Sequence, residues 1–411
     1  MKKDVSRRFV FISSNIGWGG SEDLWSGAAA VLAERGHKVT ACKAGFEPGE
    51  PLSDRLRALH CRLVPLARLP LLPRIVYSLL ARISYPLMIG YQAIVLWFRL
   101  RLGRRPDLVV FSQGGNHDGW LFAAVCVRLG LPLVIISQKA VDAFWPPDRR
   151  RAYMKAAYQH ALHCFFVSRH NLRLTREQFG TRLENASVVR NPFKVGWEPR
   201  RDWPGTDMGF RFACVGRFFP QEKGQDLLIR VLAREKWRGR PVSVTFFGSG
   251  ENGVGLAEMA AYHGLESVRF AGFTRDVGAI WANHHALVLP SRAEGLPLVL
   301  VEAMLSGRVA IVTDIAGNGE VVEDDVNGFL AATPTADALD EAMERAWQRR
   351  AEWREIGERA AADIRRLVPP DPAGTLAMQL VQLADGQLPD SGATVVSPAA
   401  NSRLAEKTVA S

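Results

Sequence analysis

Short runs of apolar residues alternate with amphipathic stretches along most of the chain. Strands of a parallel sheet are buried on both faces and read as continuous apolar runs, while the helices between them show a 3.6-residue period. Such runs predict strands at residues 8–14, 38–42, 107–112, 133–137, 210–215, 242–247, 268–270, 286–289 and 309–313, with helices at 21–35 and 119–129. Strands that alternate with helices indicate an α/β fold of doubly wound, Rossmann-like units.

The alternation stops in one stretch where three prolines and two glycines interrupt it, which is typical of a linker. After a later Pro-Pro pair a last helix is expected near 373–384, and the polar end of the chain lacks periodicity. The predicted division is a first Rossmann-like domain at 1–190, a linker at 191–207, a second Rossmann-like domain at 208–368, a final helix at 369–386 and a disordered tail at 387–411.

The composition is that of a folded globular protein, since 47% of the 411 residues are hydrophobic and 23% are charged. The five cysteines are scattered and lack metal-ligand spacing, which argues against a disulfide framework or a zinc site. We expect free thiols in a reducing compartment and interpret the protein as cytoplasmic. The apolar run near the N-terminus ends within a few residues in a glycine-rich turn, as a first Rossmann strand does and a signal peptide does not.

The net charge of +10 is compatible with a phosphorylated ligand, an anionic lipid or a nucleic acid. No RNA-binding aromatic signature or zinc-finger spacing occurs, so nucleic acid is not an expected partner. The apolar segment 75–100 is flanked by arginines, and its longest uncharged run, 83–98, is shorter than a bilayer span. Two interpretations stay open: an interfacial helix pair in peripheral contact with an anionic membrane, and a helix packed against the first sheet.

A glycine-rich loop with Gly17, Gly19 and Gly20 follows the first predicted strand. Glycines let the backbone approach a ligand, and the next helix offers free N–H groups to an anion. A dinucleotide frame fails, because Gly-x-Gly-x-x-Gly begun at Gly17 ends at Glu22 and the second strand lacks an acid for a ribose. We expect Gly19 and Gly20 to approach a phosphate or a sugar; the alternative is a plain turn capped by Ser21.

Two cations follow the strand predicted at 210–215. Gly216 and Arg217 come directly after it, and Lys223 stands where the next helix opens. Ligands of open α/β sheets bind at the carboxyl ends of strands. A nucleoside diphosphate gains negative charge when a sugar leaves it, and two preset cations would stabilise that charge without a metal ion.

The most specific motif is Pro-Ser-Arg-Ala-Glu-Gly-Leu-Pro-Leu-Val-Leu-Val-Glu-Ala-Met. Pro297 suits the first turn of a helix, where its missing N–H has no partner to lose. The N–H groups of Leu298 and Val299 would be unpaired and would face a phosphate. Glu294 precedes this helix and Glu302 lies just over one turn inside it, so the two carboxylates would face one pocket and accept hydrogen bonds from sugar and ribose hydroxyls.

Two further glycine turns accompany this motif. Gly248 and Gly250 follow the strand at 242–247, where the nucleotide base or ribose would lie. A second turn at 316–320 follows the strand at 309–313. Each turn taken alone is also compatible with a plain connection between elements.

In this order the motifs resemble those of the retaining glycosyltransferases of family 4, which have the two-Rossmann GT-B fold. The resemblance is carried by Val-Gly-Arg, Lys-Gly-Gln-Asp-Leu-Leu, Phe-Gly-Ser-Gly, the long motif above and Gly-Asn-Gly-Glu, and it covers residues 210–330 closely. It implies two domains that face a cleft, with acceptor binding in the first and donor binding in the second. It also implies that the final helix crosses back onto the first domain.

The resemblance assigns roles to single residues. Arg217 and Lys223 would bind the donor diphosphate, Glu302 would hold the nucleotide ribose, and Glu294 would hold the donor sugar. The expected catalytic residues are His117, Arg217, Lys223 and Glu294. The expected donor contacts are Gly19, Gly20, Gly216, Arg217, Lys223, Gly248, Gly250, Glu294, Gly295, Leu296, Pro297, Leu298, Val299 and Glu302.

His117 is the candidate for a family histidine near the anomeric carbon, because it lies just past the strand at 107–112. Its surroundings depart from the usual family pattern, and Gln138 replaces a second family histidine. A helix-capping or surface role for His117 is the alternative.

The predicted function is transfer of a sugar, with retention, from a nucleotide-diphosphate sugar to a glycan or lipid-linked acceptor in surface polysaccharide or lipopolysaccharide synthesis. The resemblance favours same-face attack, in which a donor phosphate oxygen helps to remove the acceptor proton. No cofactor and no metal are expected, and Asp324-Asp325 is interpreted as an exposed turn. The expected location is the cytoplasm, with the inner face of the cytoplasmic membrane as the site of any peripheral contact. A non-catalytic nucleotide-sugar or glycan-binding module, a GT-B epimerase and a phosphorylase are the alternatives.

Overall fold

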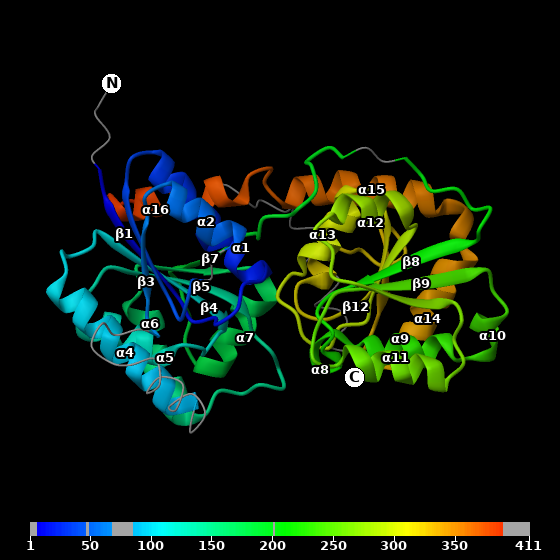
Figure 1. Ribbon diagram of the computed structural model, residues 1–411, viewed down its shortest axis with the longest axis horizontal. Helices are drawn as coiled ribbons and strands as arrows, with labels where there is room; N and C mark the ends of the chain where they lie inside the picture. Colours follow the sequence, from blue (N-terminus) through cyan, green and yellow to red (C-terminus); the bar gives the residue numbers. More distant parts are fainter. Residues whose placement is uncertain (1–5, 47–48, 68–84, 200–201, 389–411) are drawn as a thin grey trace.

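The computed structural model describes two lobes that lie side by side (Figure 1). The described residues are 6–46, 49–67, 85–199 and 202–388. Each lobe is built on one parallel sheet with helices on both faces, so the predicted α/β class with two doubly wound units is confirmed. Residues 75–84 of the predicted apolar segment and residues 389–411 of the predicted tail lie outside the described residues.

The first lobe has a seven-stranded parallel sheet in the order β3-β2-β1-β4-β5-β6-β7. Its strands are β1 (Arg8–Ser13), β2 (Lys38–Lys43), β3 (Arg62–Pro65), β4 (Leu108–Gly115), β5 (Leu133–Lys139), β6 (His163–Phe166) and β7 (Ala186–Val188). One face is covered by α1 (Gly20–Glu34), α2 (Pro51–Ala58) and α16 (Pro372–Ala384). The other is covered by α4 (Tyr85–Leu102), α5 (Trp120–Arg128), α6 (Asp148–His160) and α7 (Arg169–Phe179).

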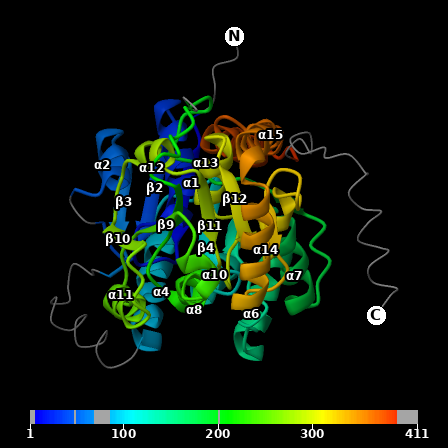
Figure 2. The ribbon, with the colours of Figure 1, turned by 90° about the vertical axis from the view of Figure 1, so that its right-hand side faces the viewer.

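The second lobe has a six-stranded parallel sheet in the order β10-β9-β8-β11-β12-β13. Its strands are β8 (Phe210–Val215), β9 (Val242–Phe247), β10 (Val268–Gly272), β11 (Ala286–Leu289), β12 (Val309–Thr313) and β13 (Phe329–Ala331). One face carries α9 (Gln225–Leu232), α10 (Glu235–Arg238), α11 (Gly253–Tyr262) and α14 (Ala336–Gln348). The other carries α12 (Val277–Asn283), α13 (Leu298–Leu305) and α15 (Trp353–Leu367), which lie toward the top of Figure 2. The short elements are α8 (Pro220–Lys223), η1 (Asn318–Glu320) and η2 (Arg350–Glu352).

The strands are apolar on both sides because each sheet separates two cores. In β4, Val109 and Phe111 belong to the core under α4 to α7, and Leu108 and Val110 belong to the core under α1 and α16. All four side chains are fully buried. This two-residue alternation between cores explains why a continuous apolar run forms a strand here.

The last helix returns to the first lobe. After α15, Asp371 caps α16 by accepting a hydrogen bond from the Gly374 N–H at 2.9 Å. Leu376 and Leu380 of α16 are fully buried in the same core as Leu24 of α1. Figure 1 shows this crossing above the sheets, from the second lobe to the first. The final helix therefore joins the two lobes covalently and by packing.

Some local predictions are corrected by the structure. Helix α1 begins at Gly20 with Gly19 at the N-cap, so Ser21 does not cap it; the Ser21 hydroxyl instead accepts a hydrogen bond from the Asn15 amide. Four short strands, β3, β6, β7 and β13, were not predicted from the apolar runs. β7 and β13 contain three residues each, which is too short for a pattern to show.

The described part of the apolar segment packs against the first sheet through one side of α4. Ala93, Val95 and Leu96 are buried in the core, while Ile94 and Phe98 are about half exposed. None of the helices in the described ranges has both the length and the apolar character needed to cross a bilayer. The packed-helix interpretation holds for residues 85–100, and an apolar strip stays on the surface.

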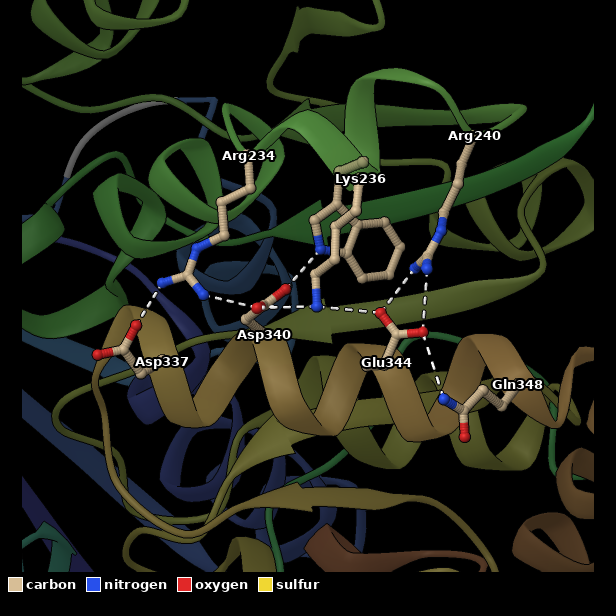
Figure 3. A network of polar contacts seen from close by, with 8 residues as sticks. Arg234, Lys236, Arg240, Asp337, Asp340, Glu344 and Gln348 are labelled. Carbon is tan, nitrogen blue, oxygen red and sulfur yellow. Dashed lines mark hydrogen bonds and ion pairs between the residues drawn. The ribbon is translucent and has the colours of Figure 1, made fainter.

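A network of charges fixes α10 against α14 (Figure 3). Lys236 Nζ lies 2.9 Å from Asp340 Oδ2 and 3.0 Å from Glu344 Oε2. Arg240 makes a two-pronged contact with Glu344, and Arg234 reaches Asp340 at 2.6 Å. Hydrogen bonds from Arg240 lower the pKa of Glu344 to about 2. These ion pairs hold the segment 234–240, which contains α10, against α14 of the second lobe.

Candidate active site

The carboxyl ends of the two sheets meet between the lobes. Lys139 Nζ, at the end of β5, lies 2.6 Å from Glu222 Oε1 in α8 of the second lobe. A Cβ atom on Gly295, in the loop after β11, would lie 2.1 Å from the Gln138 carbonyl oxygen. Strand order reverses between β1 and β4 and between β8 and β11. Open α/β sheets bind ligands at such points, so the junction of the lobes is the expected site.

A cavity of about 460 Å³ lies at the reversal point of the first sheet. The loop after β1 contributes Gly17 and Gly19, and the loop after β4 contributes His117. Arg150 of α6 and Arg217 of the second lobe complete its walls. Three of the predicted site residues, Gly19, His117 and Arg217, therefore share one cavity.

A buried lysine fixes the glycine-rich loop on this cavity. Lys43 Nζ, at the end of β2, donates hydrogen bonds to the carbonyl oxygens of Asn15 and Gly17 and, at 2.8 Å, to Glu22 Oε2. The Lys43 and Glu22 side chains are both fully buried, and burial lowers the pKa of Lys43. Ser13 and Asn15 donate further hydrogen bonds to Glu22. One buried ion pair thus holds the shape of the loop.

His117 faces the cavity with a perturbed pKa. Burial lowers this pKa; the negative charge of Asp118 opposes the shift and the positive charge of Arg150 adds to it. The ring Nδ1 lies 3.3 Å from Asn116 Oδ1. Helix α5 has Gly119 at its N-cap and no side-chain cap, so His117 does not cap it. The imidazole therefore lines the cavity, and its burial favours the neutral form.

Arg217 lies on the opposite wall and shares a carboxylate with the first lobe. Its Nη2 lies 3.0 Å from Glu222 Oε2, while the other oxygen of Glu222 contacts Lys139. Burial would raise the pKa of Glu222, but the charges of Lys139, Arg217 and Lys223 lower it overall. The Arg217 side chain is 62% exposed, so it is free to turn toward a ligand.

Lys223 and Glu294 form an ion pair at the reversal point of the second sheet. Lys223 Nζ lies 2.6 Å from Glu294 Oε1, and Ser291 Oγ donates to the same oxygen at 2.8 Å. Both charged side chains are largely buried. The two predicted diphosphate cations are thus each paired with a carboxylate. For the largely buried Lys223 such a partner is required, because a charge that is removed from water needs compensation.

Helix α13 presents its N-terminus to the first lobe. Pro297 is the N-cap residue in an extended conformation, not a residue of the first turn as predicted. No hydrogen bond is made by the N–H groups of Leu298 and Val299 to any described residue, as expected for the first turn of a helix. A Cβ atom on Gly20 would lie 2.6 Å from Leu298 Cδ1, so the two predicted anion-binding segments are adjacent.

Glu302 is a buried carboxylate on α13. Its Oε1 accepts a hydrogen bond from the Lys194 backbone N–H at 2.8 Å, and the Lys194 ammonium lies 3.3 Å from Asp23. Burial raises the pKa of Glu302. Neither Glu302 nor Glu294 lines the cavity of the first sheet. Glu294 pairs with the Lys223 ammonium and Glu302 accepts from the Lys194 backbone, so the two carboxylates have different partners.

Backbone packing explains two of the predicted glycines. A Cβ atom on Gly248 would lie 1.9 Å from the Gly216 carbonyl oxygen, and one on Gly250 would lie 2.4 Å from that of Phe218. The loops after β8 and β9 are therefore in direct backbone contact. Leu296, another predicted contact, is buried.

Sequence reasoning did not single out Lys43, Trp120 or Arg150. Lys43 ends the strand next to β1, where only an acid was expected to matter, and Arg150 stands in a run of three arginines, 149–151, that matches no motif. In the portion of the chain that the structure describes, no group of three or more His, Cys, Asp or Glu residues could hold a metal ion. Asp324 and Asp325 both pair with Arg345.

Several proteins are similar in sequence to part of this chain. A glycogen synthase of Pseudomonas syringae pv. syringae is 30% identical over 270 residues, which are 56% of this chain and 55% of that protein. The Vi polysaccharide biosynthesis protein VipC/TviE of Salmonella typhi is 38% identical over 78 residues, 19% of this chain and 14% of that protein. The chain spans about half the length of the glycogen synthases it matches.

Solved structures share the fold at low sequence identity. HepE of Anabaena, in complex with UDP, superposes with a TM-score of 0.69 at 20% identity, covering 92% of this chain and 100% of that one. Sucrose-phosphate synthase of Thermosynechococcus elongatus gives a TM-score of 0.68 at 18% identity, covering 92% and 98%. The predicted GT-B fold is confirmed.

Family models cover both lobes. The model described as glycosyl transferases group 1 matches residues 209–349, and the glycosyl transferase 4-like domain matches residues 19–192. Together they contain the Lys43–Glu22 pair, the Lys223–Glu294 pair and the part of the cavity wall that follows residue 18. The chain belongs to the group 1 glycosyltransferases.

Proposed function

We propose that this chain transfers a sugar from a nucleotide-diphosphate sugar to a glycan or lipid-linked acceptor, with retention of the anomeric configuration. The observation that carries the proposal is the Lys223–Glu294 pair at the reversal point of the second sheet. An ammonium group suits the diphosphate, and an adjacent carboxylate suits the hydroxyls of the transferred sugar. The UDP in the HepE complex supports a nucleotide donor for this fold.

Donor binding would exchange partners within the site. The diphosphate would compete with Glu294 for Lys223 and with Glu222 for Arg217, so that each cation keeps an anionic partner. The N–H groups at the start of α13, which adjoins Gly20 of the first lobe, would add two hydrogen-bond donors for the diphosphate. As the sugar leaves, charge grows on the diphosphate, and this set of preset donors stabilises it.

The first lobe would bind the acceptor in its cavity. His117 and Gly19 lie on the cavity wall, where a neutral imidazole can hold a sugar hydroxyl. In the proposed step the acceptor oxygen bonds to the anomeric carbon on the face from which the phosphate oxygen departs, and that phosphate oxygen takes the acceptor proton. No metal ion takes part, so EDTA leaves the rate unchanged.

We also propose that α4 contacts the anionic inner face of the cytoplasmic membrane. Leu87, Ile94 and Phe98 are each about half exposed, and Leu102 is 80% exposed. These positions follow one side of the helix, and exposed arginines occupy its last turn. Vesicles of anionic lipid should bind the protein at low salt and neutral vesicles should not; binding to neither would remove this contact.

Release of nucleoside diphosphate tests the central activity. Wild-type protein is incubated with UDP-, GDP- and ADP-sugars and a panel of glycan acceptors, and the anomeric proton of the product is read by NMR. We expect Lys223→Ala and Glu302→Ala to abolish release, while the exposed controls Lys38→Ala and Glu266→Ala leave it unchanged. Full activity of both site variants would contradict the assignment. Donor binding without turnover on any acceptor would favour a non-catalytic sugar-nucleotide-binding module instead.

A further inference from the structure

The cavity of the first lobe contains a cation without a partner. Arg150 lines the cavity, and among the described residues its guanidinium has no ion pair and no hydrogen bond. The neighbouring Arg151 pairs with Asp148, and Arg217 across the cavity pairs with Glu222. Arg150 is therefore the guanidinium of this cavity that is left to a ligand.

The acidic side chain on the cavity wall, Asp118, does not pair with Arg150. Asp118 Oδ2 accepts a hydrogen bond from the Gly115 N–H at 2.6 Å, which ties that carboxylate to its own loop. The negative charge of Asp118 acts more strongly on the imidazole of His117 than the positive charge of Arg150 does. The place in this cavity for an anion is therefore at the guanidinium of Arg150 itself.

An aromatic wall stands beside Arg150. Trp120 lines the cavity, and its ring lies 5.0 Å from that of Tyr153, one turn along α6 from Arg150. Aromatic faces bind the apolar faces of sugar rings, and a guanidinium binds carboxylate or phosphate through two parallel hydrogen bonds. A sugar that bears an anionic group fits both features at once.

We propose that the acceptor carries an anionic group, a carboxylate or a phosphate, that binds Arg150 while its sugar ring packs on Trp120. That the ligand is an acceptor rests on the proposed glycosyl transfer. Binding of the anionic sugar at Arg150 does not require turnover and can be measured without it. A uronic acid unit would supply a carboxylate, and a lipid-linked or phosphorylated sugar would supply a phosphate. The chemistry that recognises either group is the same.

Tryptophan fluorescence tests the proposal, because Trp18 and Trp120 both line the cavity. The full chain is titrated with methyl β-glucuronide, glucose 1-phosphate and the neutral control methyl β-glucoside. We expect at least one anionic probe to bind about tenfold more tightly than the neutral one. The anionic probe that binds identifies the source of the charge.

Variants assign that preference to one side chain. Arg150→Gln should reduce the preference to about onefold and Arg150→Lys should keep part of it, since an ammonium retains the charge without the fork. Arg149→Gln, an exposed neighbour outside the cavity wall, should behave as wild type. Equal binding of all three probes, no saturable response to either anion, or an unchanged preference in Arg150→Gln would each overturn the proposal.

Failure here is distinguishable from failure of the proposed function. Donor turnover without an anionic preference would remove only the Arg150 site. An anionic preference that Arg150→Gln abolishes, in a protein that turns over no donor, would leave the Arg150 site in place and remove the transferase.

Discussion

Replacing Lys43 by methionine should destabilise the first lobe strongly. Lys43→Met removes the ammonium that lies 2.8 Å from Glu22 Oε2 and also contacts the carbonyl oxygens of Asn15 and Gly17. Both members of the ion pair are fully buried, so the Glu22 carboxylate is left buried without its cation. Breaking a buried pair in this way costs about 3–5 kcal/mol.

A second substitution separates the stranded charge from the lost packing. Ser13 and Asn15 both donate to Glu22 Oε1, so in Lys43→Met/Glu22→Gln a single amide oxygen can still accept from both, and the double variant should recover more than about 1 kcal/mol of the loss. Because the loop at 15–17 loses its tether in both variants, both should release nucleoside diphosphate more slowly than wild type.

Urea unfolding followed by tryptophan fluorescence measures the loss, with the exposed variant Lys38→Met as the matched control. The early transition should be read separately if the lobes unfold in two steps. A Lys43→Met variant within about 0.5 kcal/mol of wild type would refute the reasoning, since that is the range of neutral surface substitutions. A double variant no more stable than Lys43→Met would show that the buried charge is not the cause.

Three further substitutions test other parts of the structure. Glu302→Gln keeps an acceptor for the Lys194 N–H and removes a buried charge, so the thermal midpoint at pH 7 should rise by about 2 °C. The rise in midpoint that the donor causes in wild type should disappear in this variant. A midpoint below that of wild type would contradict the burial argument. Gly295→Ala would place a Cβ atom 2.1 Å from the Gln138 carbonyl oxygen, so small-angle scattering should report a wider separation of the lobes, whereas Gly255→Ala, with open space around it, should not. Glu344 has a pKa of about 2 in the folded protein, below its ordinary 4.5, so it contributes stability that is present above pH 4.5 and is lost as the pH falls toward 2. Between these pH values the thermal midpoint of Glu344→Gln should fall less steeply than that of wild type. Parallel curves for the two proteins would exclude the network as the cause of the acid destabilisation.

The fold was predictable because buried parallel strands leave a strong pattern. β4, β8 and β12 read as apolar runs since each faces a core on both sides, and the predicted starts or ends agree with the structure within a few residues. The missed strands β7 and β13 are three residues long and lie at sheet edges, and three residues are too few for a pattern to show.

The members of the site were easier to predict than their pairing. The motif identified Lys223 and Glu294, but their ion pair joins residues that are 71 positions apart, and sequence spacing carries no such information. The Lys43–Glu22 pair escaped prediction because a lysine in a strand is usually a solvated residue, and only the adjacency of β1 and β2 buries it. That Arg150 lines the cavity could not be predicted from the sequence, because it depends on the position of α6 in the fold.

Calorimetric titration of the full chain with UDP-, GDP- and ADP-sugars tests the central claim most directly: the second lobe holds a nucleotide-sugar donor at Lys223. We predict that one donor class binds wild-type protein, that Lys223→Met weakens its binding at least about tenfold, and that Lys38→Met leaves it unchanged. Equal donor binding by wild type and Lys223→Met, or no binding of any of the three donors to wild type, would contradict the account.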